Sequence, residues 1–369
     1  MCLLVCLVLF LTGKKPEPVT LRVSLYKTLP DYEGFEKKTA ECWNEKHPEV
    51  KLEFADWDCY SGDVPEDLDV FVIDAISLDA YAGKGVLLPL SKEEIRDYED
   101  LIPSFAEGCR VDGTLYVVPQ LLCTELLYTR KEDTALKDVQ SIDELREALE
   151  DRELILEKMS ALAQVCRYLQ ALMDENKQYM DHFPVIEKGK LSGTAADSLR
   201  KMRELYLPDP EGVSKESGWY PSARLFAGGR GRAYIGYSEA MDVMGEKASD
   251  MDFRLFSMTN GENIPVLYVD AAAVNAKIAE EKRGLALEFL NMITGRELLA
   301  RVLANDGNPR YLLSARYSVY DELGAGDPIY AKLKTVAAVP RAFVFRIKPD
   351  GDAYLDAAAE KVETENLYD

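Results

Sequence analysis

The first hundred residues alternate between strand-like and helix-like patterns of apolar positions. LRVSLY, at residues 21–26, alternates apolar and polar side chains as a half-buried strand does. The segment that follows, to about Lys46, has apolar residues at helical spacing, and residues 50–54 alternate again. DVFVID, at residues 69–74, is a near-continuous apolar run typical of a buried parallel strand. This order of elements predicts an α/β sheet.

The ends of these strands indicate where a ligand would bind. Tyr26 and Asp74 lie at the carboxyl ends of two strands, and ADWDCY, at residues 55–60, directly follows the third. Ligands of open parallel sheets bind beyond the carboxyl ends of the strands. We therefore expect a pocket rim of tyrosine, tryptophan and carboxylate side chains.

The rest of the chain continues the alternation. Capping boxes at Ser91 with Glu94 and at Ser141 with Glu144 predict two helix starts. Strands are expected at residues 113–120, closed by Pro119, and at residues 126–131. Helices are expected over about 154–180 and 195–207, and two more over 281–304.

The amino terminus reads MCLLVCLVLFLTGKKPEP, an apolar run followed by two lysines. The run is too short to span a bilayer but has the length of a signal-peptide core, although no basic residue precedes it. It predicts a leader over residues 1–18 and a secreted or periplasmic protein. Beyond this leader, no membrane association is expected.

Charge narrows the class of ligand. The formal net charge is -21 at pH 7, which disfavours nucleic acid and favours a cationic small molecule. The two histidines, His47 and His182, lie in polar contexts typical of the surface. Acid–base chemistry is therefore expected from a carboxylate.

The cysteines argue for a free thiol rather than a metal site. Two of the seven fall in the leader, and an odd number remains, so at least one cannot pair within the chain. No CxxC spacing occurs and histidines are scarce, so a zinc site is not expected. The remaining cysteines are Cys42, Cys59, Cys109, Cys123 and Cys166.

Several segments together resemble the type II periplasmic solute-binding proteins: a strand near VVP, then LLYTRK, AYIGYSE and ALEFLNMITGRELLARVL. The resemblance implies a two-lobed α/β fold with a central cleft. We assign residues 19–122 plus about 265–310 to the first lobe, and residues 123–264 plus about 311–369 to the second.

Four segments, in order, resemble thiaminase I (thiamine pyridinylase) more specifically: DWDCY, PEDLDVFVIDAI, VPQLLCTELLYTRK and GYSEAM. The resemblance implies that Cys123 is the nucleophile and Glu239 its base. It also implies an acidic and aromatic pyrimidine pocket, at positions matching Tyr26, Tyr60, Asp74, Tyr220, Tyr237, Tyr268 and Asp270. One departure is that Lys27 and Thr28 follow Tyr26, where the family commonly has Pro-Tyr.

The activity implied is transfer of the pyrimidinylmethyl group of thiamine to an amine, pyridine or thiol, through a covalent adduct of Cys123. No cofactor is needed, and a monomer is expected. Other interpretations remain open. The apolar residues around Cys123 are also typical of a cysteine in the core, and Glu239 could be a solvated loop residue. Asp74 and Asp270 could each be the N-cap of a helix. The chain could also be a non-catalytic binding protein for thiamine, a pyrimidine or a sugar.

Overall fold

The computed structural model describes residues 19–150, 152–157, 161–176, 193–208, 219–346 and 359–360. The predicted leader and His182 lie outside these residues. Within them, no helix combines the length and apolarity needed to cross a membrane.

The larger sheet of the described chain has seven strands, in the order β12–β6–β11–β3–β1–β2, with β13 beside β11. β1 is parallel to both β2 and β3, whereas β11 is antiparallel to β3 and β6. The predicted α/β class is confirmed. The strand bounds are β1 Thr20–Ser24, β2 Lys51–Phe54, β3 Val70–Asp74, β6 Val118–Cys123, β11 Val266–Val274, β12 Leu313–Ser314 and β13 Phe343–Val344.

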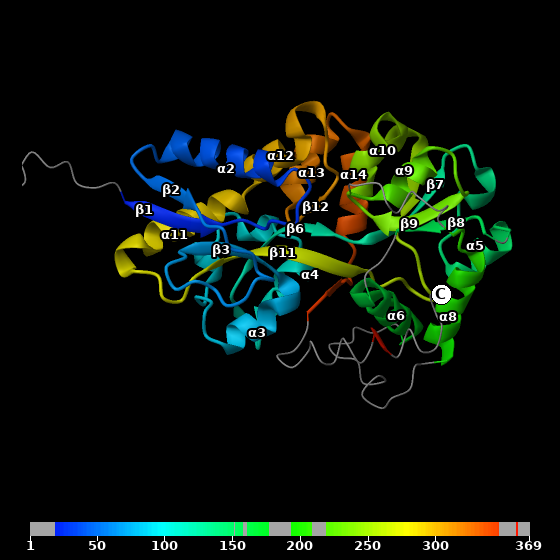
Figure 1. Ribbon diagram of the computed structural model, residues 1–369, viewed down its shortest axis with the longest axis horizontal. Helices are drawn as coiled ribbons and strands as arrows, with labels where there is room; N and C mark the ends of the chain where they lie inside the picture. The colour runs from blue at the N-terminus through cyan, green and yellow to red at the C-terminus, as the bar shows by residue number, and fades with distance from the viewer. Residues whose placement is uncertain are drawn as a thin grey trace, which may run out of the picture.

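A second sheet has the order β10–β7–β9–β8 and lies to the right in Figure 1. Only Thr124 separates β6 of the larger sheet from β7 of the smaller, so the chain changes sheet immediately after Cys123. The bounds are β7 Glu125–Arg130, β8 Leu154–Leu156, β9 Ala233–Tyr237 and β10 Met251–Arg254, and a separate hairpin pairs β4 Arg110–Val111 with β5 Thr114–Leu115.

Helices surround both sheets (Figure 1). Those around the larger sheet are α2 Tyr32–Lys46, α3 Leu78–Gly83, α4 Pro103–Gly108, α11 Glu280–Ile293, α12 Arg296–Ala304 and α13 Tyr317–Gly324. The others are α5 Ile142–Ala148, α6 Ala161–Asn176, α8 Gly193–Leu205, α9 Pro221–Ala227, α10 Ala240–Met244 and α14 Pro328–Ala337.

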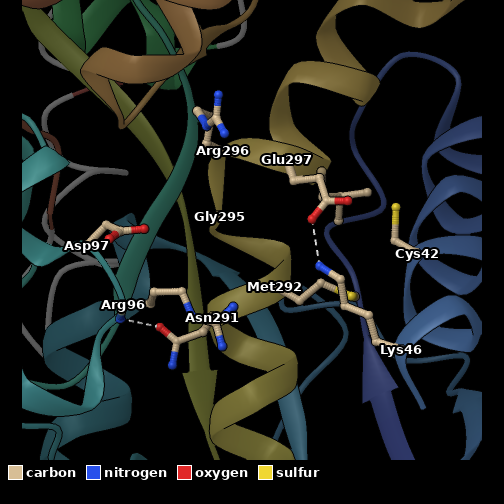
Figure 2. A pocket seen from close by; sticks show the side chains of 10 residues that line it. Cys42, Lys46, Arg96, Asp97, Asn291, Met292, Gly295, Arg296 and Glu297 are labelled. Atoms are coloured by element: carbon tan, nitrogen blue, oxygen red, sulfur yellow. Dashed lines mark hydrogen bonds and ion pairs between the residues drawn. The ribbon is translucent and has the colours of Figure 1, made fainter.

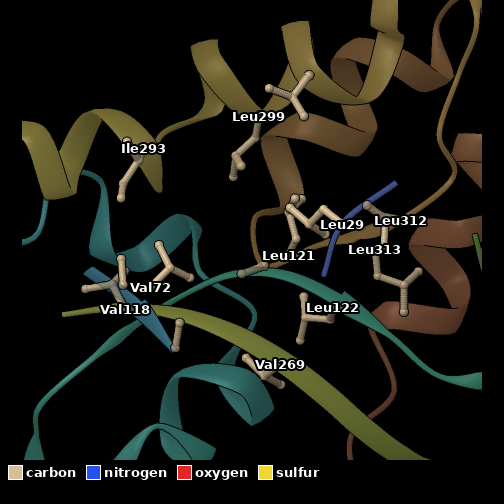
Figure 3. Packing of buried hydrophobic residues seen from close by; sticks show 14 of the residues in the cluster. Leu29, Val72, Val118, Leu121, Leu122, Val269, Ile293, Leu299, Leu312 and Leu313 are labelled. Carbon is tan, nitrogen blue, oxygen red and sulfur yellow. The ribbon is translucent and has the colours of Figure 1, made fainter. Parts of the chain in front are cut away.

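The central strands of the larger sheet are buried on both faces, as the apolar run of β3 predicts. Val118 and Leu121 of β6 are fully buried, as are Val269 of β11 and Leu299 of α12 (Figure 3). Each such side chain contributes about 1.5 to 3 kcal/mol relative to an exposed one. This packing fixes the strands whose ends carry the predicted site residues.

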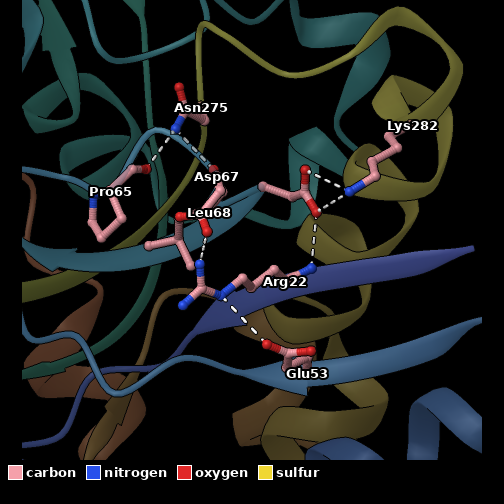
Figure 4. A network of polar contacts seen from close by, with 8 residues as sticks. Arg22, Glu53, Pro65, Asp67, Leu68, Asn275 and Lys282 are labelled. Atoms are coloured by element: carbon pink, nitrogen blue, oxygen red, sulfur yellow. Dashed lines mark hydrogen bonds and ion pairs between the residues drawn. The ribbon is translucent and has the colours of Figure 1, made fainter.

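A polar network fastens the start of β3 to its neighbours (Figure 4). Asp69 accepts hydrogen bonds from the backbone N–H of Arg22 at 2.8 Å and from Lys282 Nζ at 3.0 Å. Asn275, which follows β11, donates to the carbonyl of Leu68 at 2.8 Å. The network holds β3 in register at the end opposite Asp74.

Two boundaries differ from the sequence prediction. Pro119 does not close a strand but is the second residue of β6, opposite a register shift between Asp270 and Ala271 where a ladder N–H is not required. Leu154–Leu156 is not helical but forms β8, parallel to β9, since a short apolar run fits either structure.

The lobe boundaries remain a prediction, with one difference for the carboxyl-terminal stretch. β12 pairs with β6 and β13 with β11, all in the larger sheet, although the sequence predicts that residues 311–369 belong to the second lobe. In contrast, Lys332 of α14 binds Asp252 of β10 in the smaller sheet. The stretch therefore contacts both sheets.

A second passage between the sheets, residues 255–265, is held by a buried carboxylate. Asp174 of α6 is fully buried and accepts backbone hydrogen bonds from Met258 and Ile264, both at 2.7 Å. Burial raises the pKa of Asp174 from its ordinary 3.8 to about 7, and these hydrogen bonds only partly offset the rise.

This pKa predicts a loss of stability with rising pH. The folded-state pKa exceeds the unfolded one, so the contribution is complete below about pH 4 and disappears as the pH rises through 7. Between pH 5 and 8, the free energy of unfolding of the wild type, measured with urea, is expected to fall by about 2 to 3 kcal/mol more than that of Asp174→Asn, whose amide cannot ionise. Equal pH dependence in both proteins would contradict this assignment.

Candidate active site

A cavity of about 310 Å³ lies where the two sheets meet. Thr28, Leu29, Pro30, Leu122, Trp219 and Leu312 contribute to its walls. All nine residues predicted for the site also line it, namely Tyr26, Tyr60, Asp74, Cys123, Tyr220, Tyr237, Glu239, Tyr268 and Asp270. The structure thus brings the whole set together, while the roles of its members stay predictions.

Cys123 is the last residue of β6 and pairs with Tyr268 of β11. The other described cysteines are free and buried, whereas Cys123 is free and partly exposed to the cavity. Because the chain leaves the larger sheet at Thr124, whose hydroxyl donates to the carbonyl of Val266 at 2.7 Å, the thiol lies at the junction of the sheets. It is therefore not a core cysteine.

Glu239 is the N-cap residue of α10, directly after the turn that follows β9, and is 5 % exposed. Its Oε1 accepts a hydrogen bond from the Tyr220 hydroxyl, and its Oε2 accepts one from Ser238 Oγ at 3.1 Å. The Cys123 thiol lines the same cavity, and it and this carboxylate shift each other's pKa. Glu239 is therefore not a solvated loop residue but a buried acceptor beside the thiol.

The electrostatics of this pair follow from burial. Desolvation raises the pKa of Glu239, although its hydrogen bonds from Tyr220, Ser238 and Cys123 oppose the rise. Desolvation also raises the pKa of Cys123 well above 9.0, and the negative charges of Glu239 and Asp270 raise it further. At neutral pH the thiol therefore keeps its proton until a base accepts it.

A hydrogen-bonded chain joins three predicted residues from the larger sheet. The hydroxyls of Tyr26 and Tyr60 lie 2.9 Å apart, and Tyr60 donates to Asp74 Oδ2 at 2.5 Å. The other oxygen of Asp74 accepts the N–H of Ile76 at 2.9 Å, capping the turn Ala75–Ser77. Asp74 is thus both a cap and a cavity residue.

Asp270 faces Asp74 across the pairing of β11 with β3. It is 8 % exposed, and none of the described residues donates a hydrogen bond to its carboxylate. Burial, together with the charges of Asp74 and Glu239, raises its pKa well above 3.8. Asp270 thus presents an acceptor to the cavity that a bound ligand could satisfy.

The aromatic wall comes from both sheets and from the start of α9: Tyr237 is in β9, Tyr268 is in β11, and Tyr220 is the N-cap residue of α9. The ring centroids of Tyr237 lie 5.6 Å from those of Tyr268 and 6.2 Å from those of Tyr220. Trp219 continues the wall at 6.1 Å from Tyr220 and is 44 % exposed. In contrast, Trp57, in the segment expected at the rim, is buried in the core.

Two supporting features of the site have no signal in the sequence. The Tyr128 hydroxyl donates to the carbonyls of Tyr237 and Ser238, at 2.8 and 3.3 Å, and so fixes the turn before Glu239. Tyr220 has φ 53° and ψ 57°, a left-handed conformation that is uncommon for a bulky residue. Neither the hydrogen bonds of Tyr128 nor the backbone conformation of Tyr220 could be inferred from an apolar pattern.

A second pocket, of about 170 Å³, contains Cys42 but offers no comparable thiol (Figure 2). Cys42 is 1 % exposed, and Nη1 of Arg301 lies 3.2 Å from its sulfur. Lys46 pairs with Glu297 at 2.6 Å across this pocket. Because the Cys42 thiol is almost completely buried, nucleophilic chemistry is not expected there.

The cavity that holds Cys123 is acidic. Its lining includes Asp74, Glu239 and Asp270 but no lysine, arginine or histidine. Arg167, whose charge acts on nearby Tyr237, is bound by Glu125 through contacts of 2.8 and 3.1 Å from its Nε. In the described part of the chain no cluster of residues suitable for a metal ion occurs.

Fold and site together define a two-lobed, periplasmic-binding-protein-like protein whose cavity is lined by both a thiol and a buried carboxylate. Comparison with known proteins gives the family. Residues 124–259 match the model of the Thiaminase-1 domain. The chain is 34 % identical to Thiaminase-1 of Paenibacillus thiaminolyticus over 357 residues, 93 % of this chain and 87 % of that protein. The chain belongs to the thiaminase I family, as the resemblance predicted.

Solved structures agree. Clostridium botulinum thiaminase I in complex with thiamin matches with a TM-score of 0.86 and 35 % identity, over 94 % of this chain and 99 % of that one. Thiaminase I from Bacillus thiaminolyticus matches with the same TM-score, 34 % identity and the same coverage. A maltose-bound T. maritima protein shares the fold at 15 % identity and a TM-score of 0.69, over 94 % of each chain.

Proposed function

We propose that this chain cleaves thiamine and transfers its pyrimidinylmethyl group to a small nucleophile, with Cys123 as the covalent catalyst. The observation that carries this proposal is that the Cys123 thiol and the buried Glu239 carboxylate line the same acidic cavity, where each acts on the ionisation of the other. A protein that only captures a solute has no need of this pair. The relative solved in complex with thiamin supports the choice of substrate.

The cavity suits both halves of thiamine. The thiazolium ring carries a positive charge, which the surplus of carboxylates attracts, and aromatic faces such as Tyr237 and Trp219 can stack on it. Asp270 and Asp74 can accept hydrogen bonds from the amino group of the pyrimidine. Closure of the lobes would exclude water from the reaction.

The first half of the reaction uses the thiol and its base. Glu239 takes the proton of Cys123, and the thiolate forms a carbon–sulfur bond to the electron-poor pyrimidine ring. The bond between the bridging methylene and the thiazolium nitrogen then breaks, and its electron pair stays on the nitrogen. Thiazole leaves as a neutral molecule, so the departing group needs no proton.

The second half regenerates the enzyme. An amine, pyridine or thiol attacks the methylene, the carbon–sulfur bond breaks, and Cys123 leaves as a thiolate that recovers the proton held by Glu239. A nucleophile that carries a proton releases it to solvent. The protein is therefore unchanged after one transfer, and atoms and charges balance without an external oxidant.

The location of the protein and its oligomeric state rest on separate observations. The apolar leader at residues 1–18 supports a secreted or periplasmic protein. All nine residues predicted for the site already meet in one cavity of a single chain, so the proposed reaction requires no residue from a second subunit, and we propose a monomer. We propose both as part of this function.

Product analysis tests the proposal. Purified protein is incubated with thiamine, with and without pyridine, and free thiazole is measured by chromatography. The proposal expects release of thiazole and formation of a pyridine adduct of the pyrimidine. Bound but intact thiamine would instead identify a carrier, and absence of thiamine binding would favour a sugar-binding protein.

The two aspartates are expected to contribute unequally to thiamine affinity. No described residue donates a hydrogen bond to the Asp270 carboxylate, so it is free to accept one from the ligand. Asp270→Asn is therefore expected to weaken thiamine binding by about 1 to 3 kcal/mol. Asp74→Asn is expected to weaken it less within that range, because both Asp74 oxygens are already bound by protein donors. Calorimetry on the Cys123→Ser background measures binding without turnover. Exposed Asp56→Asn is the control, and unchanged affinity in Asp270→Asn would remove this contact.

A further inference from the structure

A further buried carboxylate, that of Glu157, does not line the cavity but binds the start of α9, next to the cavity residue Tyr220. Glu157 directly follows β8 and is 5 % exposed. Its Oε2 accepts a hydrogen bond from the Tyr234 hydroxyl at 2.7 Å, and its Oε1 accepts the backbone N–H of Ser222 at 3.3 Å. Among the described residues it forms no ion pair with a lysine or arginine. A carboxylate buried at this cost is retained for what its hydrogen bonds hold in place.

The route from Tyr234 to Glu157 depends on a glycine. A Cβ atom at Gly236 would lie 1.9 Å from the Tyr234 hydroxyl, so only glycine leaves room for the tyrosine to extend along β9. The same ring stacks on Phe226 of α9 at 5.8 Å and 26°. Tyr234 therefore connects Glu157 to the body of α9.

Ser222, the other partner of Glu157, lies in the first turn of α9, and Tyr220 is the N-cap residue of this helix. Tyr220 has the left-handed backbone conformation described above, which persists only where its surroundings hold it. Glu157 binds the N–H of Ser222 two residues later, and the backbone of Ala223 also favours its ionised form. This fixes the direction in which the Tyr220 ring leaves the chain, toward Glu239.

We infer that Glu157 is a positioning residue, which holds the start of α9 so that the Tyr220 hydroxyl binds the Glu239 carboxylate. Its catalytic meaning rests on the proposed function. The inference adds a buried network, made by Glu157, Tyr234 and Gly236, to the residues that touch the substrate. It also explains how a bulky residue is kept in an unfavourable backbone conformation.

A consequence can be measured at Glu239. The titratable groups that face this carboxylate are Cys123, Tyr220, Tyr128 and Asp270. The hydrogen bond from Tyr220 lowers the pKa of Glu239, so loosening Tyr220 raises that pKa. The base is then protonated at a higher pH than in the wild type.

The test follows alkylation of Cys123 by iodoacetamide from pH 5 to 9, with peptide mass spectrometry to identify the thiol. Alkylation requires the thiolate, so the acid limb of its rate reports the ionisation of Glu239. Glu157→Gln is expected to move this limb upward by about half a pH unit or more, roughly the worth of one hydrogen bond, as is Tyr220→Phe. The double variant is expected to show no further shift. A wild-type profile in Glu157→Gln, or fully additive shifts, would overturn the inference.

Controls separate positioning from general damage. Glu153→Gln removes a carboxylate four residues away that pairs with Arg232 at 3.2 Å, and its profile is expected to match the wild type. If Glu157→Gln does not fold, Tyr234→Phe removes the hydroxyl donor and keeps the ring; it is expected to shift the limb in the same direction, and no shift would overturn the inference. The assay needs no thiamine. Failure of the wild type to cleave thiamine would therefore overturn the proposed function without deciding the role of Glu157.

Discussion

Cys123→Ser is expected to release no thiazole while it still binds thiamine. A serine hydroxyl has no appreciable anion at neutral pH, and Glu239 cannot generate one as it can a thiolate. The substitution changes one atom at the end of β6 and leaves the pairing with Tyr268 in place. Turnover is measured as thiazole release, and affinity by calorimetry.

A buried thiol outside the cavity supplies the control for this result. Cys109, at the end of α4, is fully buried and does not line the cavity. Cys109→Ala is expected to lower stability and leave turnover per folded molecule unchanged. Full activity in Cys123→Ser would rule out Cys123 as the nucleophile.

Glu239→Gln is expected to lower turnover by about 100-fold or more, the usual contribution of a positioned general base. Glutamine keeps the shape of the side chain and can still accept from Tyr220, so folding and thiamine affinity are expected to survive. Because thiol ionisation then depends on solvent, the rate of the variant is expected to rise with pH.

The structure fixes where that rise begins. Burial raises the pKa of Cys123 well above 9.0, and only the part due to the charge of Glu239 disappears in the variant. Recovery is therefore expected at higher pH than for an unperturbed cysteine. Exposed Glu246→Gln, just after α10, is the control. A pH profile of Glu239→Gln equal to that of the wild type would exclude Glu239 as the base.

Local pattern predicted the first three strands of the larger sheet, β3 from its continuous apolar run and β1 and β2 from the alternation of apolar and polar residues. The expected strands at residues 21–26, 50–54 and 69–74 correspond to β1, β2 and β3. The predictions at Pro119 and at Leu154–Leu156 were wrong for the same reason. Whether a proline ends a strand, and whether a short apolar run forms a strand, depend on pairing with residues that are distant in the sequence. β11 and β9 supply those partners here.

The site residues required family resemblance as well as pattern. Apolar residues surround Cys123 in sequence, and only the change of sheet after Thr124 brings its thiol to a cavity. The positions of Tyr26, Tyr60 and Asp74 at or just after strand ends agree with their place in the cavity lining, whereas Trp57 is buried in the core.

Hydrogen bonds between distant segments could not be predicted from the sequence. Tyr220 and Glu239 are 19 residues apart, and Glu157 and Ser222 are 65 apart. No periodicity or motif encodes such contacts, because they depend on how α9 packs against the smaller sheet. One of them, the hydrogen bond from Tyr220, nevertheless lowers the pKa of the proposed base against the effect of burial.

The most direct test of the central claim is the mass of the protein during a single turnover. The wild type, mixed with thiamine without an added acceptor and quenched rapidly, is predicted to gain the mass of one pyrimidinylmethyl group, located on the peptide that contains Cys123. Addition of pyridine before the quench is predicted to remove this mass, and Cys123→Ser is predicted never to acquire it. Thiazole release without any adduct on Cys123, or an adduct on another residue, would contradict the account.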